Sequence, residues 1–238
     1  MIAVLPDKHR FSTPLQTIDI SHDDARASLF LQASTLLGLD RARLVTSGLK
    51  ATSSRGDTLA LEDGRLAAEA VEGKENAYRI GAEIEGLFPT EEALGLLDPT
   101  GVLPKRVDNL RADAELTFTA PWDRNAVENS RPQLTEVILT DLSARWGDVT
   151  FRAAGQVTVD EVGVPEGEIT IRAEEWRRML DMADSAGAVP QALRGTVETA
   201  LGLLSGGTEV LDAPLVFSGG RIWLGIIPLG TAPRLVIR

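Results

Sequence analysis

Alternation of apolar and polar residues with a period of two is the feature that most constrains the fold. Residues 110–118 read Leu-Arg-Ala-Asp-Ala-Glu-Leu-Thr-Phe, so every second side chain is apolar. Residues 78–84 and 149–159 alternate similarly, and residues 134–146 do so less regularly, with Leu134, Ile138, Leu142 and Trp146 expected on the apolar side. Neighbouring side chains of a strand point to opposite faces, so the pattern predicts strands with one buried and one solvated face. Strands of a parallel sheet are apolar on both faces, and we therefore expect an antiparallel sheet.

Glycine-bearing segments between these stretches predict tight turns. Asp63-Gly64 separates two short apolar runs, and Gly219-Gly220 separates two others. Glycine adopts positive φ without steric cost, which suits the short turns of hairpins. A third turn is expected over residues 161–167, before residues 168–172 return along the preceding strand. The sequence therefore predicts a series of β-hairpins.

Three segments interrupt the alternation and predict helices over residues 90–97, 173–186 and 190–204. Thr90 is a suitable N-cap, and acidic residues follow it in the first turn. Residues 173–186 place Trp176, Met179, Leu180 and Ala183 on one face. Residues 190–204 carry a second apolar face and end at a Ser-Gly-Gly turn. We expect these last two amphipathic helices to cover part of one face of the sheet.

The composition leaves little of the usual chemistry of active sites. The chain has no Cys and two His, and 24 basic residues stand against 35 acidic ones, which gives a net charge of −11. Thiol catalysis and thiolate metal sites are excluded, and the negative charge disfavours a nucleic-acid partner. His22 has no second His nearby in the sequence and is interpreted as part of a solvated loop. No nucleophile elbow, Walker loop or dinucleotide fingerprint is present. We expect no enzymatic activity, no catalytic residues, no metal and no cofactor.

Several ordered motifs resemble those of a known bacterial family. They are Thr-Ala-Pro-Trp-Asp-Arg at 119–124, Leu-Ser-Ala-Arg-Trp-Gly-Asp at 142–148, Ala-Gly-Gln-Val-Thr-Val-Asp at 154–160, Pro-Glu-Gly-Glu-Ile-Thr-Ile-Arg at 165–172, Trp-Arg at 176–177, and a closing stretch at 213–230. On these motifs the chain resembles the bacterial domain-of-unknown-function family numbered 2125, from about Ala3 onward. The motifs contain no catalytic signature, so the resemblance implies no catalytic residues.

Proteins of this family look like envelope proteins of Gram-negative bacteria, with an N-terminal hydrophobic anchor ahead of β-rich sequence. The resemblance implies a periplasmic protein, or one anchored in the inner membrane and facing the periplasm. It also implies that the N-terminal anchor, which would be the only link to the membrane, and the first strands are missing from this chain. The succession of strand and turn segments is similar to that of AsmA-like envelope proteins, whose long curved sheets are associated with phospholipid movement.

The chain is thus expected to be mainly β with α (α+β). Its curved antiparallel sheet of β-hairpins should have one apolar face partly covered by the two C-terminal helices. We expect residues 1–238 to form a single β-rich domain, with a seam between two similar sheet halves near residues 99–104.

Two functions remain open. In the first, a non-enzymatic envelope protein binds or moves a lipid, an acyl chain or another apolar ligand along the curved sheet. The candidate ligand-binding residues on the apolar face are Leu110, Leu116, Phe118, Val149, Phe151, Val157, Ile169 and Ile171. The simpler interpretation of these side chains is a closed core beneath the helices. The alternative function is a periplasmic scaffold or assembly factor that binds another envelope protein through a sheet edge or a surface patch.

Overall fold

The structure, a computed structural model, describes residues 2–237 apart from 5, 13–15, 100, 102, 188, 190 and 226. The strands are β1 (Ile2–Val4), β2 (Lys8–Ser12), β3 (Thr17–Ser21), β4 (Asp24–Leu31), β5 (Leu39–Ser53), β6 (Thr58–Ala70), β7 (Ala77–Phe88), β8 (Val107–Phe118), β9 (Leu134–Trp146), β10 (Val149–Val159), β11 (Pro165–Glu174), β12 (Val210–Ser218), β13 (Arg221–Leu224) and β14 (Ile227–Thr231). The helices are α1 (Glu91–Leu97), α2 (Arg124–Glu128), α3 (Trp176–Ser185) and α4 (Arg194–Leu204), with a 3₁₀ turn at Gln191–Leu193.

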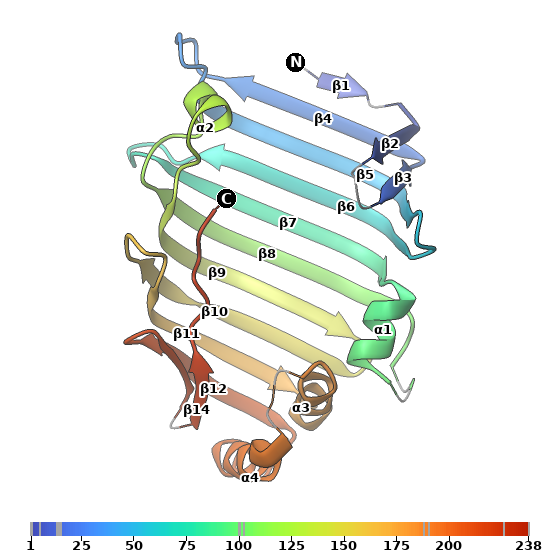
Figure 1. Cartoon of the computed structure of the whole chain (residues 1–238), viewed down its shortest axis with the longest axis vertical. Helices are drawn as coiled ribbons and strands as arrows, with labels where there is room; N and C mark the ends of the chain where they lie inside the picture. The colour runs from blue at the N-terminus through green and yellow to red at the C-terminus, as the bar shows by residue number, and fades with distance from the viewer. Residues whose placement is uncertain are drawn as a thin grey trace.

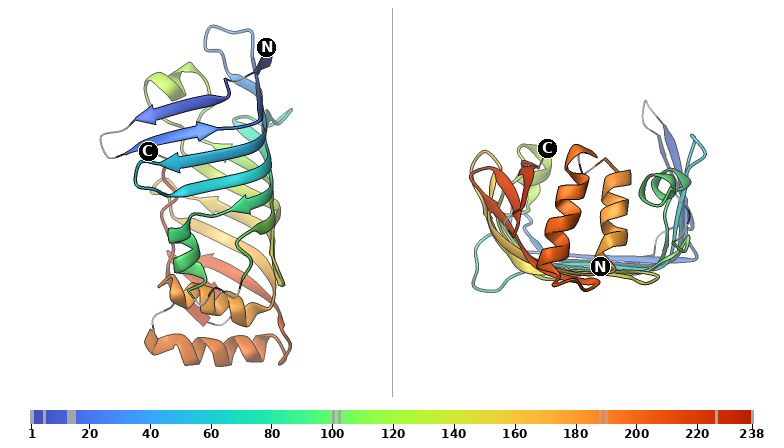
Figure 2. Two further views of the ribbon diagram at one scale, coloured as in Figure 1. Left: turned by 90° about the vertical axis from the view of Figure 1, so that its right-hand side faces the viewer. Right: turned by 90° about the horizontal axis from the view of Figure 1, so that it is seen from below.

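The described strands form one antiparallel sheet of 14 strands (Figure 1). From β4 to β14 each strand pairs with the next one in sequence, and the small β2–β3 hairpin attaches to the end of β5. The sheet bends into an open trough, and α1, α3 and α4 lie on its inner side (Figure 2). This arrangement confirms the predicted α+β fold, including the two C-terminal helices over one face.

The strands on either side of residues 99–104 are direct neighbours. β7 pairs with β8 from Ala77↔Thr117 to Leu87↔Val107, and α1 lies in the connection between them. The sheet therefore runs without a break past this position.

The two C-terminal helices pack on the inner face of the last strands. Trp176 and Leu180 of α3 and Val197 and Leu201 of α4 are buried in one cluster with residues of β11, β12, β13 and β14. α3 begins at Trp176, three residues later than the predicted start, because β11 continues to Glu174 and the chain turns at Glu175 with φ 58°. Pro190, the predicted start of the second helix, lies outside the described residues. Among the described helices, none has the length and apolar character needed to cross a bilayer.

The predicted turn at Asp63-Gly64 is wrong, whereas the one at Gly219-Gly220 is confirmed. Ser218 and Arg221 are paired across the second turn. Gly64 instead lies inside β6, opposite Thr46 and Ile84. A Cβ at Gly64 would lie 3.1 Å from Cγ2 of Thr46, so glycine here permits close packing inside a long strand.

Candidate functional site: the apolar trough

The inner face of the sheet, here called the trough, is lined by apolar side chains from one end to the other. Directly opposed residues of neighbouring strands share a face, so the register defines rows that cross the sheet. One row is Ala27, Leu44, Leu66, Ala82, Ala112, Leu142, Ala153, Ile171 and Ala213. A second is Leu29, Ala42, Ala68, Ile80, Ala114, Leu139, Gly155, Ile169, Leu215 and Leu224.

Two further rows flank these. One is Ala25, Thr46, Gly64, Ile84, Leu110, Ala144, Phe151, Ala173 and Leu211. The other is Ala70, Tyr78, Leu116, Val137, Val157, Gly167, Phe217 and Ile222. The residues named in these four rows include no charged side chain. Their two hydroxyls are engaged, since Thr46 Oγ1 donates to the Asp24 carbonyl and Tyr78 Oη accepts from the Trp122 amide.

The outer face of the same strands is charged. The row next to Ala112 contains Arg26, Val45, Arg65, Glu83, Arg111, Ser143, Arg152, Arg172 and Asp212. Glu83 forms ion pairs with Arg65 at 3.4 Å and with Arg111 at 3.2 Å. The sheet is therefore strongly amphipathic, with hydrocarbon inside the trough and paired charges outside it.

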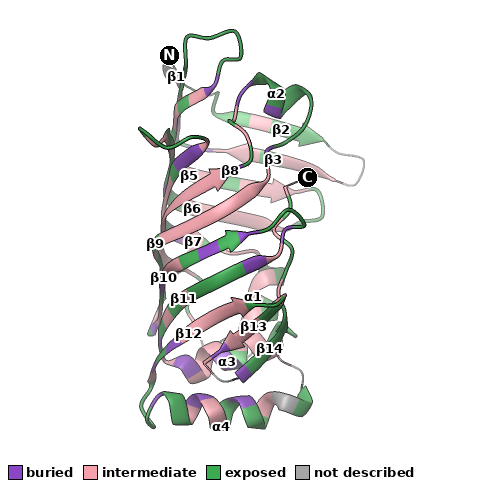
Figure 3. Ribbon diagram, turned by 90° about the vertical axis from the view of Figure 1, so that its left-hand side faces the viewer, coloured by how far each residue is buried: buried purple, intermediate pink, exposed green. Residues whose placement is uncertain are grey.

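Much of the trough floor is uncovered. Leu66 is 48% exposed and Leu142 is 38% exposed, although both lie in the first apolar row. Strands β8 and β9 are mostly half-buried, and β6 alternates between half-buried and exposed residues (Figure 3). A pocket of about 540 Å³ lies against β4, β5, β6 and β7 and is lined by residues that include Leu29, Leu44, Leu66 and Ile80. Soluble proteins seldom leave so continuous an apolar surface open to water.

The other end of the trough is roofed by helices. A cavity of about 470 Å³ lies between the sheet and α1 and α3, lined among others by Leu97, Leu110, Trp146, Phe151 and Met179. A neighbouring cavity of about 290 Å³ shares Phe151 and Met179 with it and reaches α4. The trough thus passes from an open part, with its pocket against β4–β7, to a roofed part, where the helices cover β10–β13 and the adjoining ends of β7, β8 and β9.

All eight residues predicted to bind a ligand lie along the trough. Phe151 and Ile171 face the helices, Leu110 and Leu116 lie on β8, and Ile169 lies on β11. Phe118, Val149 and Val157 are buried. Phe118 packs edge to face against Tyr78 and Trp122. The prediction omitted the apolar residues of β5 and β6, among them Leu44 and Leu66. The predicted turn at Asp63-Gly64 divides β6, the strand of Leu66, into two short segments.

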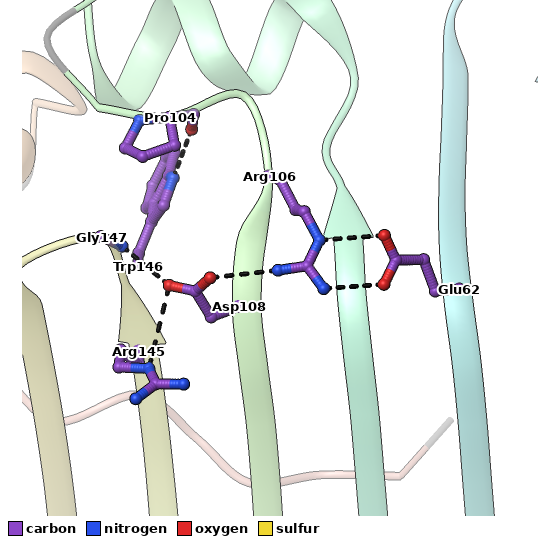
Figure 4. A network of polar contacts seen from close by, with 7 residues as sticks. All are labelled: Glu62, Pro104, Arg106, Asp108, Arg145, Trp146 and Gly147. Atoms are coloured by element: carbon purple, nitrogen blue, oxygen red, sulfur yellow. Dashed lines mark hydrogen bonds and ion pairs between the residues drawn. The ribbon is translucent and has the colours of Figure 1, made fainter.

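A polar network holds the rim beside the roofed part (Figure 4). Arg106 donates to both carboxylate oxygens of Glu62, at 3.0 and 2.7 Å, and to Asp108 at 3.1 Å. Asp108 in turn accepts from the amide of Gly147 at 3.1 Å. Trp146, which lines the 470 Å³ cavity, is oriented by its Nε1 donating to the Pro104 carbonyl. The hydrogen bonds from Arg106 hold the pKa of Glu62 below its usual range.

His22 is buried, so its interpretation as part of a solvated loop is wrong. Its ring stacks on that of His9 with centroids 5.9 Å apart, and neither ring nitrogen of His22 has a hydrogen-bond partner. His22 directly follows β3, and the pairing of β2 with β3 brings His9 and Asp7 against it, a contact that sequence spacing did not indicate. Within the described part of the chain, no three His, Asp or Glu side chains gather into a metal-binding group.

Comparisons with known proteins identify one family. A family model described as "uncharacterized protein conserved in bacteria (DUF2125)" matches residues 1–233. No curated protein and no solved structure matches the chain.

Proposed function

We propose that this chain, which belongs to the bacterial family DUF2125, is a non-enzymatic protein whose trough binds a lipid or another ligand with an acyl chain. One observation carries the proposal: four rows of uncharged side chains cross the sheet, and helices cover only one end of them. The remainder is half-exposed hydrocarbon that faces inward. An elongated apolar ligand would complete this missing layer.

The chemistry of the trough favours hydrocarbon over a polar ligand. Transferring a CH₂ group from water to such a surface is worth about 0.8 kcal/mol, so a long acyl chain gains several kcal/mol along the floor. A charged headgroup placed on the floor would lose its hydration with no ionic partner in the four rows. We therefore expect the headgroup to lie at a rim and the protein to discriminate weakly between headgroups.

The same chemistry supports a role without catalysis. Hydrocarbon offers no nucleophile or proton carrier; of the two hydroxyls, that of Thr46 donates to the Asp24 carbonyl and that of Tyr78 accepts from the Trp122 amide. We place the proposed role in the periplasm, where an acyl chain needs shielding from water between two membranes. The resemblance to envelope proteins supports this location, and fractionation of cells producing the protein tests it.

A matched pair of exposed residues tests ligand binding. Leu66 in the trough is 48% exposed, and Val45 on the outer face of the adjacent strand is 44% exposed. Because both positions are exposed, a polar side chain at either one stays in contact with water. Leu66→Asp places a charge in the path of the acyl chain, whereas Val45→Asp joins a surface that is already charged.

The measurement is mass spectrometry of lipids extracted from protein purified without detergent. We expect wild type and Val45→Asp to carry the same lipids, and Leu66→Asp to carry at least about tenfold less, because a charge on the floor opposes hydrocarbon binding. Lipid-free wild type, or equal lipid content in both variants, would refute the proposal. The scaffold alternative then remains, with a sheet edge as the binding surface.

A further inference from the structure

The end of β4 and the loop that follows it form an unusual surface at the open end of the trough. Nine consecutive residues, 29–37, are exposed, and none of them is charged, in a chain of which 25% is charged. Five of the nine are large apolar residues, namely Leu29, Phe30, Leu31, Leu36 and Leu37. A solvated loop normally carries charged or small polar side chains, so this composition indicates a surface that is covered in use.

Backbone hydrogen bonds fix the position of this loop. Gln32 N donates to Gly38 O at 2.8 Å and closes the loop on itself. Arg124 N donates to Leu36 O at 2.9 Å, and Leu39 N donates to Trp122 O at 2.7 Å, so the loop is joined to the start of α2. α2 adds Val127, which is 83% exposed. We call residues 29–37 together with Val127 the apolar tip.

The apolar tip continues the trough. Leu29 lines the 540 Å³ pocket, Leu31 ends the same strand, and the loop carries Leu36 and Leu37 beyond it. α2 and this loop lie at the end of the molecule opposite α3 and α4 (Figure 1). An apolar path therefore leads from the trough floor to an exposed projection at its open end.

The charges around the tip suit a lipid bilayer. Residues 24–43 and 123–128 together contain four arginines, three aspartates and one glutamate, so they have no net charge, although the whole chain has a net charge of −11. The general repulsion of this acidic protein from a membrane surface is therefore absent at the tip. Leucines on a projecting loop, interspersed with Gln32, Ser34 and Thr35, match the boundary between acyl chains and headgroups, where hydrocarbon and hydrogen-bonding groups meet.

We propose that the apolar tip inserts into the surface of a lipid bilayer and places the open end of the trough against it. An acyl chain could then pass between bilayer and trough without crossing water. This step rests on the proposed lipid-binding function, because it supplies the route by which the trough is loaded. The partner is the bilayer itself, and insertion depends on apolar contact more than on charge.

The test is flotation of the whole chain with vesicles of phosphatidylcholine and phosphatidylethanolamine. The test variant is Leu36→Ser with Leu37→Asn, since Asn suits the positive φ of 53° at Leu37. The control is Leu96→Ser with Leu203→Ser, which removes two leucines that are equally or more exposed, on α1 and α4. We expect the tip variant to lose at least about tenfold in vesicle partition and the control less than about twofold. Partition of the wild type into vesicles should change little between about 0.1 and about 0.5 M salt, because salt screens ionic attraction but not apolar contact.

A second readout separates this proposal from lipid binding as such. A fluorescent fatty acid dissolved below its micelle concentration should bind the tip variant as well as the wild type, and bind Leu66→Asp poorly. Equal vesicle partition of tip variant and control would overturn the bilayer proposal while leaving the trough intact. Tip-dependent flotation of a protein that binds no fatty acid would uphold the tip and refute the trough. Concentration-dependent dimers that the tip variant abolishes, with no flotation of the wild type, would overturn the bilayer proposal in favour of a second copy.

Discussion

At the scale of single residues, one glycine and one carboxylate fix the rim beside the roofed part of the trough. Gly86 has φ 61°, and a Cβ there would lie 2.3 Å from the Glu62 side chain. The absence of that Cβ lets Glu62 lie across β7 and receive both hydrogen bonds from Arg106. Sequence alone shows a glycine near the end of an alternating stretch, and this contact across strands explains why it is needed.

The Glu62–Arg106 pair predicts a specific pH dependence. The pKa of Glu62 is lowered in the folded protein by the hydrogen bonds from Arg106, so its contribution to stability is present above the unfolded pKa of about 4.3 and is lost as the pH falls through the folded value. Glu62→Gln should therefore be less stable than wild type at pH 7, and the difference should shrink below about pH 4. Urea unfolding of wild type and Glu62→Gln at about pH 7 and again below about pH 4 measures this difference in stability. Glu161→Gln, at an exposed position in the β10–β11 turn, is the control; a constant difference for Glu62→Gln would contradict the assignment.

At the scale of elements, α3 is the main anchor of the roof. Trp176 is buried among β11, β12 and α4, and its Nε1 donates to the Thr208 carbonyl at 2.9 Å. Removing its ring leaves a cavity between the helix and the sheet. We expect Trp176→Ala to lower the free energy of unfolding by about 3–5 kcal/mol, measured by urea unfolding.

The matched control is Trp223→Ala on β13, where the indole is only half-buried and its strand position is opposite Val216. Trp223→Ala should lower the free energy of unfolding clearly less than Trp176→Ala does. Similar losses for the two substitutions would show that α3 is not the anchor. If Trp176→Ala does not fold, Leu180→Ala removes part of the same contact and should cost about 2–5 kcal/mol.

Sequence patterns predict the elements well where the alternation is regular. The apolar positions of residues 110–118 all lie on one face, because β8 is paired along its whole length. Ile138 was expected on that same face, yet it is opposite Glu115 and Gln156 on the charged face. The register between β8 and β9 shifts between Asp113 and Ala114 and again near Phe118, which changes the side that β9 residues face. Such bulges depend on pairing and cannot be recognised in one strand alone.

At the scale of the whole molecule, one amphipathic sheet has too few helices to cover it. A sandwich would bury the apolar face under a second sheet, but here the floor over β4–β6 and over residues such as Leu142 of β9 faces the open trough. The sequence indicates the apolar face and the two covering helices. It does not indicate how much of the sheet the helices cover, because this depends on where α3 and α4 pack, at β11, β12, β13 and β14. The eight predicted residues lie on β8, β10 and β11, and Leu44 and Leu66 in the open part are identified only from the register.

Photo-crosslinking in cells tests the central claim, that acyl chains lie in the trough, most directly. Leu66 and Leu142 on the floor, and Val45 and Arg152 on the outer face, would each be replaced by benzoylphenylalanine. After illumination, the purified proteins are examined by mass spectrometry for covalently attached lipid. The account predicts lipid adducts at Leu66 and Leu142 and none above background at Val45 and Arg152. Equal labelling of both faces, or no labelling of the floor, would contradict it.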